Sequence, residues 1–367
     1  MRIFKVLKKF RFVIVLLVVN MLLSFLIEPA NGASARMWSG YYAQEELDTI
    51  FVGSSVCQQT FIPDIFDENL GVKSYNMGTP SQAMPQTMQA IKAAVEEHEV
   101  KTIIYAMGFS SLMYEPIPEA EITFESARVR KKGGFDGVVD TVEYILSEDV
   151  ISSEKSVNFL FPWLYNYETL SVETIVKNAS EKLQKLKEYI QTGKYDPTDG
   201  LKKGFRNDEA GVFNYDNRWI HNTYNYYGEE FSEEMLAEFE VMLEFCKQNE
   251  VELIVINVPH PAFDVVTCYR SYEQNECLIK SYCEKYDVDY YDFSLAKQEV
   301  FEIKQKYFGD FEHLNRAGAE VFCQQLCEFL ARRVEDEDMS RSFYTVDEFL
   351  MLQADELEEW NKHAIIK

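Results

Sequence analysis

Three side chains of this sequence are of the types that together break an ester bond: Ser55 near its start, and Asp310 and His313 near its end. A serine hydroxyl is a weak nucleophile until an imidazole takes its proton, and a carboxylate must hold that imidazole and stabilise its charge. The spacing Asp310-x-x-His313 can supply both groups from one turn. Taken alone, Ser54 and Ser55 are typical of a turn or a helix N-cap. Their position in the fold therefore decides whether one of them can act as a nucleophile.

Five apolar, β-branched runs predict the strands that would position these groups. They lie at 48–54, 72–78, 101–108, 251–259 and 288–293. Most are continuous rather than alternating, as in strands buried on both faces, and helical patterns separate them. This alternation predicts a parallel sheet with helices on both faces, whose reactive groups gather beyond the carboxyl ends of the strands. Ser55 and Ser110 follow such runs, and Gly78 ends one.

Two stretches depart from that alternation. Residues 113–230 are rich in Tyr, Trp, Asn and charged residues and exceed a simple crossover, which favours an insertion or cap over the edge of the sheet. Aromatic clusters at 158–170 and 213–227 suit stacking on sugar rings, although a self-packed cap is the simpler interpretation. The tail at 336–367 is acidic and carries a helical pattern.

The charge and the cysteine content limit the classes of ligand that this chain is expected to bind. The formal charge of -25 argues against nucleic acid, because affinity for phosphate backbones comes mostly from Lys and Arg. Seven cysteines leave at least one unpaired, and neither a CxxC pair nor a Cys/His spacing indicates a metal site. The cysteine and histidine spacing therefore predicts no metal site.

The N-terminus carries a membrane signal. A basic start precedes an uncharged run at 12–27, which with its flanks approaches the roughly 20 residues needed to cross a bilayer. We expect a cytoplasmic stub and signal anchor over 1–35, with the rest of the chain outside the cell. The alternatives are a secreted protein, cleaved after the small-residue triplet that ends at Ala35, and a buried core helix.

The order of these motifs resembles that of the SGNH/GDSL hydrolase superfamily. "VGSS" after the first strand, "YNMGTPSQ" after the second and "DFEHLNRAGAEVF" near the end resemble its blocks I, II and V, spread over 48–330. The likeness is nearest to membrane-anchored members of bacterial envelopes, including the teichoic-acid D-alanylation proteins, which also carry Gly-Ser-Ser. It implies a three-layer α/β/α, flavodoxin-like domain over 36–335.

The resemblance also implies roles for residues. It places the nucleophile on Ser55, the base on His313 and the orienting acid on Asp310. The backbone amides of Ser55 and Gly78 would face the developing oxyanion.

Block III departs from the family pattern. Members usually have Gly-x-Asn, whose side chain is a third oxyanion donor, whereas this chain reads Gly108-Phe109-Ser110. The third donor is then Ser110 or Ser111, or it is missing. His260 follows the fourth strand, where a structural or substrate-contacting role is favoured over a catalytic one.

The resemblance implies an esterase or O-acyltransferase that acts on cell-envelope polysaccharide or teichoic acid through an acyl-serine, with no metal or organic cofactor. It also implies a membrane acyl-export protein as partner. The sequence does not distinguish a hydrolase from a transferase, because both reactions pass through the same acyl-enzyme. Two alternatives also stay open: a non-catalytic envelope protein whose degenerate site binds polymer or a partner, and a secreted hydrolase of small esters or lipids.

Overall fold

A computed structural model describes residues 11–29, 32–114, 118–146, 161, 163, 171–194, 196, 198–206, 211–215, 230–334 and 339–364. The chain forms two compact units. The helical unit comprises Met1–Ser39 and Ile117–Asp199, and the sheet unit comprises Gly40–Pro116 and Gly200–Lys367. The stretch expected to be an insertion, 113–230, is shared between them. Most of the two aromatic clusters expected within it lies outside the described residues.

The sheet unit is built on five parallel strands, one in each of the predicted runs. They are β1 (Thr49–Gly53), β2 (Ser74–Asn76), β3 (Thr102–Met107), β4 (Glu252–Asn257) and β5 (Asp289–Asp292). Their order is β2-β1-β3-β4-β5, and every neighbouring pair is parallel. The predicted parallel α/β sheet is confirmed, and it brings the carboxyl ends of all five strands to one edge.

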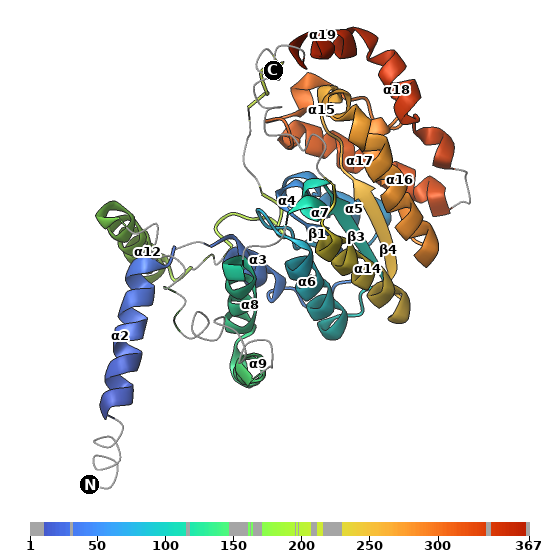
Figure 1. Ribbon diagram of the computed structural model, residues 1–367. Coiled ribbons are helices and arrows are strands. Elements are labelled where there is room, and N and C mark those ends of the chain that lie inside the picture. Colours follow the sequence, from blue (N-terminus) through green and yellow to red (C-terminus); the bar gives the residue numbers. More distant parts are fainter. Residues whose placement is uncertain are drawn as a thin grey trace. The chain divides into compact units, whose positions relative to one another are not determined.

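Helices cover both faces of this sheet (Figure 1). Successive residues of a strand point to opposite faces of the sheet. Phe51 and Ile104 are paired in register on neighbouring strands, so their side chains point to the same face. They share a hydrophobic cluster with side chains of α4 (Ser55–Thr60), α5 (Pro63–Leu70) and α17 (Arg316–Val334).

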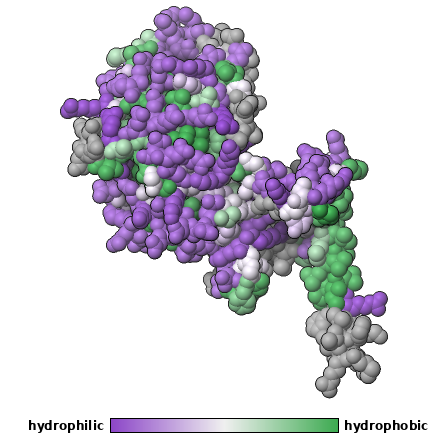
Figure 2. Space-filling view, turned by 180° about the vertical axis from the view of Figure 1, so that it is seen from behind, coloured by the Kyte–Doolittle hydropathy of each residue, from purple (hydrophilic) through white to green (hydrophobic). Residues whose placement is uncertain are grey.

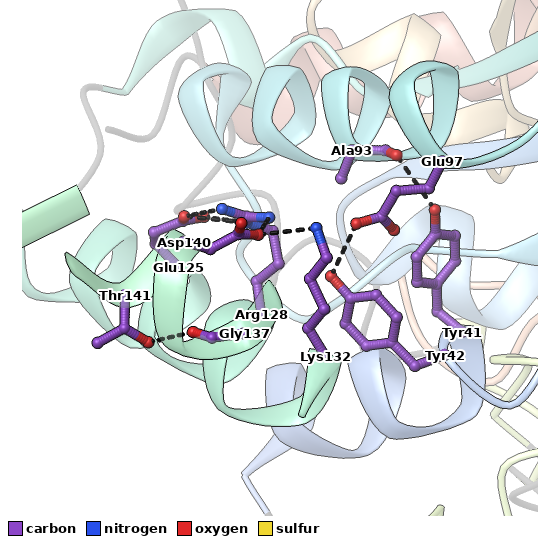
Figure 3. A network of polar contacts seen from close by, with 10 residues as sticks. All are labelled: Tyr41, Tyr42, Ala93, Glu97, Glu125, Arg128, Lys132, Gly137, Asp140 and Thr141. Carbon is purple, nitrogen blue, oxygen red and sulfur yellow. Dashed lines mark hydrogen bonds and ion pairs between the residues drawn. The ribbon is translucent and has the colours of Figure 1, made fainter. Parts of the chain in front are cut away.

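The other face packs against α6 (Met84–Glu97) and α14 (Glu233–Gln248), with α16 (Tyr269–Tyr286) beside α14. On this face Tyr105 of β3 contacts the ring of Phe239 at a centroid distance of 6.2 Å. The segment before β1 is fixed to α6, because the Tyr41 hydroxyl donates to the Ala93 carbonyl (Figure 3).

Short helices complete the sheet unit. They are α7 (Ser110–Met113), α15 (Ala262–Thr267), α18 (Val346–Leu352) and α19 (Ala354–Ala364). Of these, α18 and α19 lie in the tail, where the sequence has its helical pattern. The Thr345 hydroxyl accepts from the Glu348 amide and the Glu348 carboxylate from the Thr345 amide, a capping box that starts α18. Val346 and Phe349 then pack against Tyr272.

The helical unit comprises α2 (Arg11–Ile27), α8 (Pro118–Lys132), α9 (Gly134–Leu146), α12 (Val172–Thr192) and, across the boundary between units, α3 (Ala33–Tyr41). The last carbonyls of a helix lack partners within it. At the end of α2, Lys182 Nζ of α12 donates to the carbonyls of Phe25 and Glu28 at 2.7 Å, and Asn178 donates to that of Ile27 at 2.8 Å.

An ion-pair network joins α8 to α9 in the same unit (Figure 3). Arg128 bonds Glu125 at 2.6 Å and Asp140 at 3.2 Å, and Lys132 reaches Asp140 at 2.8 Å. Glu125 is buried, and an unpaired charge there would carry a large desolvation penalty. The pairing with Arg128 offsets that penalty.

Most apolar side chains of α2 are exposed and form a continuous hydrophobic surface, whereas Ile27 at its end is buried (Figure 2). Within the described residues, however, no helix has both the length and the apolar character required to cross a membrane. The predicted anchor is therefore not confirmed.

All seven cysteines are free thiols. Cys57, Cys246, Cys283, Cys323 and Cys327 are buried, Cys268 is half-buried and Cys277 is exposed.

The turn after β1 depends on a buried side chain of β2. Asn76 Nδ2 donates to the carbonyls of Cys57 and Phe61 at 2.8 Å, and its Oδ1 accepts from the Gly78 amide at 2.9 Å. The Asn76 side chain is fully buried, so these backbone groups have little access to water.

We expect Asn76→Ala to lower the free energy of unfolding by about 3 kcal/mol, because it strips partners from buried backbone groups. Urea unfolding measures the change. Asn69→Ala removes an exposed side-chain bond to a carbonyl in α5 and should cost less than about 0.5 kcal/mol. Equal losses for the two variants would contradict the structural role of Asn76.

Candidate active site

Ser55 lies at the carboxyl edge of the sheet, directly after β1. Gly53 ends the strand with φ of 140°, and a Cβ there would lie 2.5 Å from the Ala106 carbonyl oxygen of β3. Only glycine fits this tight turn. Ser54 follows as the N-cap of α4 without a side-chain capping bond, and Ser55 is the first residue of the helix. The strand-to-helix turn therefore presents Ser55 above the sheet.

The three residues predicted to act together do meet. His313 Nε2 lies 2.8 Å from Ser55 Oγ, and His313 Nδ1 lies 2.9 Å from both carboxylate oxygens of Asp310. A carboxylate can only accept, so Nδ1 carries the proton and the lone pair of Nε2 faces the serine hydroxyl. Ser55 donates to His313, which is the direction needed for proton removal.

Asp310 remains charged at neutral pH. Burial alone would raise the pKa of its carboxyl, but the hydrogen bond and charge of His313 and the amides of Glu312 and His313 together lower it. These amides donate to Asp310 Oδ1 at 2.8 and 2.7 Å. The carboxylate is thereby fixed and can stabilise a protonated imidazole.

The loop that carries His313 is held by the residues that follow it. Asn315 donates through its backbone amide to the Tyr307 carbonyl at 2.8 Å and through Nδ2 to the Lys306 carbonyl at 2.8 Å. Its Oδ1 accepts from the Gly318 amide at 3.0 Å. A Cβ on Gly318 would lie 2.2 Å from the Tyr307 carbonyl oxygen, so the start of α17 can lie against this loop only with glycine there.

The oxyanion donors differ from the expectation. The Gly78 amide donates to Asn76 Oδ1 at 2.9 Å, so in this structure it is engaged and not free to meet an oxyanion. Ser111 is also engaged, because its hydroxyl donates to the Gly108 carbonyl at 2.7 Å. The Ser55 amide is the first of α4, and such amides have no partner within their helix. Ser55 and Ser110 are the donors that remain.

A small cavity of about 40 Å³ borders this edge of the sheet. Its walls combine apolar side chains with polar ones. The lining residues are Val56, Gly108, Phe109, Ser110, Met113, Asn257, His260, Asp264, Cys268, Ser271, Tyr272, Asn275 and Glu312. Val56 and Glu312 are the chain neighbours of Ser55 and His313, so the cavity lies one residue along the chain from each of them.

His260 lines this cavity, as expected of a residue at the edge of the site. Its Nδ1 donates to the Val258 carbonyl at 2.9 Å and lies 3.3 Å from Ser294 Oγ. Burial lowers the pKa of His260 and outweighs the charges of Glu312 and Asp310, which raise it. The ring is then neutral, and its Nε2 is left as an acceptor.

Sequence reasoning missed a polar network at the ends of β4 and β5. Asp292 accepts from the Tyr272 hydroxyl at 2.7 Å and from Asn257 Nδ2 at 3.0 Å. Asn257 and Asp292 are the last residues of their strands, paired in register. The rule that selected Ser55, a polar residue at the carboxyl end of a strand, would have found them too.

Within the described part of the chain, no cluster of three His, Cys, Asp or Glu side chains could hold a metal ion.

Comparison with known proteins gives no family assignment. Neither a family model nor a curated protein matches the sequence. Among solved structures, a GDSL-like lipase from Bacteroides thetaiotaomicron is similar over 82% of this chain and 98% of its own, with 11% identity and a TM-score of 0.37. An acylhydrolase candidate from Bacteroides fragilis is similar over 81% and 95%, with 10% identity and a TM-score of 0.36.

Two buried carboxyls near the cavity make stability depend on pH. Burial, and next the charge of Glu276, raises the pKa of Asp292 to about 7, while burial and Glu312 raise that of Asp264 to about 7. The unfolded value is about 3.9. A raised pKa in the folded state means that stability present at low pH is lost as the pH rises through 7.

We expect the free energy of unfolding to fall between pH 5 and pH 8, and to fall by about 1–3 kcal/mol less in Asp292→Asn, which cannot ionise. Urea unfolding at several pH values measures both slopes. Asp347→Asn, an exposed change in the first turn of α18, should keep the slope of the wild type. A slope unchanged in Asp292→Asn would contradict the assignment.

Proposed function

We propose that this chain is a serine esterase or O-acyltransferase of the SGNH/GDSL type, with Ser55 as nucleophile, His313 as base and Asp310 as orienting acid. The observation that carries the proposal is the hydrogen-bond relay from Asp310 through His313 to Ser55, at 2.9 and 2.8 Å. Its direction is the one that nucleophilic catalysis requires.

The geometry gives each residue a step. His313 Nε2 takes the proton of Ser55 Oγ as the oxygen bonds to the ester carbonyl carbon. The carbonyl oxygen becomes an oxyanion, which the Ser55 amide and the Ser110 hydroxyl would stabilise. His313 then gives its proton to the leaving alcohol, and an acyl-serine remains. Water or another hydroxyl attacks that ester in the second half, with the same proton transfers.

The biological setting is also a proposal. The basic start and the exposed apolar α2 support anchoring in a cell membrane, with the sheet unit outside. The resemblance to envelope proteins favours cell-envelope polysaccharide or teichoic acid as substrate, and a membrane acyl-export protein as partner. Release after cleavage near Ala35 is the alternative localisation.

A second function has one observation in its favour. The Gly78 amide is bonded to Asn76, and the third block has serine where an asparagine donor is usual. A site short of oxyanion donors favours a non-catalytic protein that binds envelope polymer or a partner.

Labelling with a fluorophosphonate separates the two functions, since the probe reacts with activated serines. We expect the full chain to be labelled, and Ser54→Ala to be labelled at the same rate. Ser55→Ala should not be labelled, and His313→Ala should react at least about 100-fold more slowly, because its serine keeps its proton. A folded wild type that resists the probe would favour the binding protein.

A second prediction concerns Asp310→Asn. An amide cannot hold the imidazole in the tautomer that the carboxylate selects, so kcat for an activated acetyl ester should drop by about 10³- to 10⁴-fold. Glu320→Gln, which removes an exposed carboxylate paired with Arg316 on α17, is the control and should keep the wild-type rate. Similar rates in both variants would remove Asp310 from the mechanism.

A further inference from the structure

The cavity beside Ser55 has a polar wall whose hydrogen bonds are incomplete. Asn257 is 2% exposed and Asn275 is 8% exposed, and both line the cavity. Asn257 ends β4, while Asn275 lies on α16. Among the described residues, neither Asn257 Oδ1 nor Asn275 Nδ2 has a hydrogen-bond partner. Buried polar atoms left in this way are uncommon and call for a physical reason.

The orientation of Asn257 is fixed by its neighbours. Its Nδ2 donates to Asp292 Oδ1 at 3.0 Å and to the Tyr272 hydroxyl at 3.0 Å. The Tyr272 hydroxyl in turn donates to Asp292. Asp292 Oδ1 also accepts from the Ser294 amide at 3.0 Å, so this oxygen acts as an acceptor and the Asn257 amide cannot turn over. Asn257 Oδ1 is therefore an acceptor that has no partner in the described protein.

The two unpaired atoms are complementary. Asn257 Oδ1 needs a donor and Asn275 Nδ2 needs an acceptor, and one hydroxyl group can be both at once. An ammonium group would leave the Asn275 amide unpaired, and a methyl group would leave both atoms unpaired. The carboxyls of Asp264 and Glu312 line the same cavity and oppose an anionic group.

The size of the cavity limits what carries the hydroxyl. A volume of about 40 Å³ holds roughly three water-sized groups, at about 10–15 Å³ each. A sugar ring is too large, whereas the end of a two- or three-carbon acyl chain fits. Val56, Phe109 and Met113 supply an apolar wall for its carbon atoms.

We infer that this cavity is the acyl pocket of the site and selects a short acyl group bearing a hydroxyl, of the glycolyl or lactyl kind. The inference rests on the proposed function, because it takes Ser55 as the residue that receives the acyl group. The hydroxyl donates to Asn257 and accepts from Asn275 while Ser55 Oγ replaces the leaving alcohol at the acyl carbon.

The test compares 4-methylumbelliferyl lactate with the propionate, which differs by that one hydroxyl. For the full chain, we expect kcat/KM for the lactate to exceed that for the propionate by at least about 10-fold, after division by the rates of the two esters with hydroxide. Asn275→Leu should bring this ratio close to 1, mainly by slowing the lactate. Asn249→Leu, an exposed change at the end of α14, should keep the wild-type ratio.

Fluorophosphonate labelling of the same proteins separates the two ways to fail. If Asn275→Leu is labelled like the wild type, its fold and nucleophile are intact, and its ratio tests the pocket. A labelled wild type without preference for the lactate, or an Asn275→Leu variant that keeps the preference, overturns this inference alone. A folded wild type that is neither labelled nor active on either ester overturns the proposed function and the pocket together.

Discussion

The hydrogen bond between His313 and Ser55 joins residues 258 positions apart, and much of the sheet unit serves to keep it. One partner is held by the turn after β1, and the other by the loop before α17. The helices next to this turn and this loop are bonded to each other. The Cys323 thiol of α17 donates to the Thr60 carbonyl at 3.0 Å, and its sulfur accepts from the Ile62 amide at 3.3 Å. The helix that follows the base is thus bonded to the end of the helix that starts with the nucleophile.

Buried amide side chains do most of the positioning. Asn76 closes the turn after β1, Asn315 holds the loop of His313, and Asn257 bridges β4 to β5. Loops at the edge of a parallel sheet have backbone groups that no strand or helix satisfies, and such groups need partners when they are buried. An asparagine supplies a donor and an acceptor without adding charge.

The sequence predicted the five strands because continuous apolar runs record burial on both faces, and it predicted the triad because strand ends and the Asp310-x-x-His313 spacing are local features. It could not predict that the Gly78 amide would donate to Asn76 Oδ1, because this bond depends on the orientation of a side chain within a buried loop. Asn257 and Asp292 could have been selected as polar residues at strand ends. The bond from Tyr272 to Asp292 could not, because hydrogen bonds between residues 20 apart leave no mark on periodicity.

The free thiols have a consequence for how the molecule is made. No disulfide joins any two of the seven cysteines, so burial, hydrogen bonds and ion pairs specify the fold, and the chain needs no oxidant or disulfide isomerase to reach it. Burial raises the pKa of the Cys57 and Cys323 thiols, which keeps them protonated and poorly reactive. Cys277 is the one exposed cysteine of the seven, which makes it a natural attachment point for a spectroscopic probe on α16.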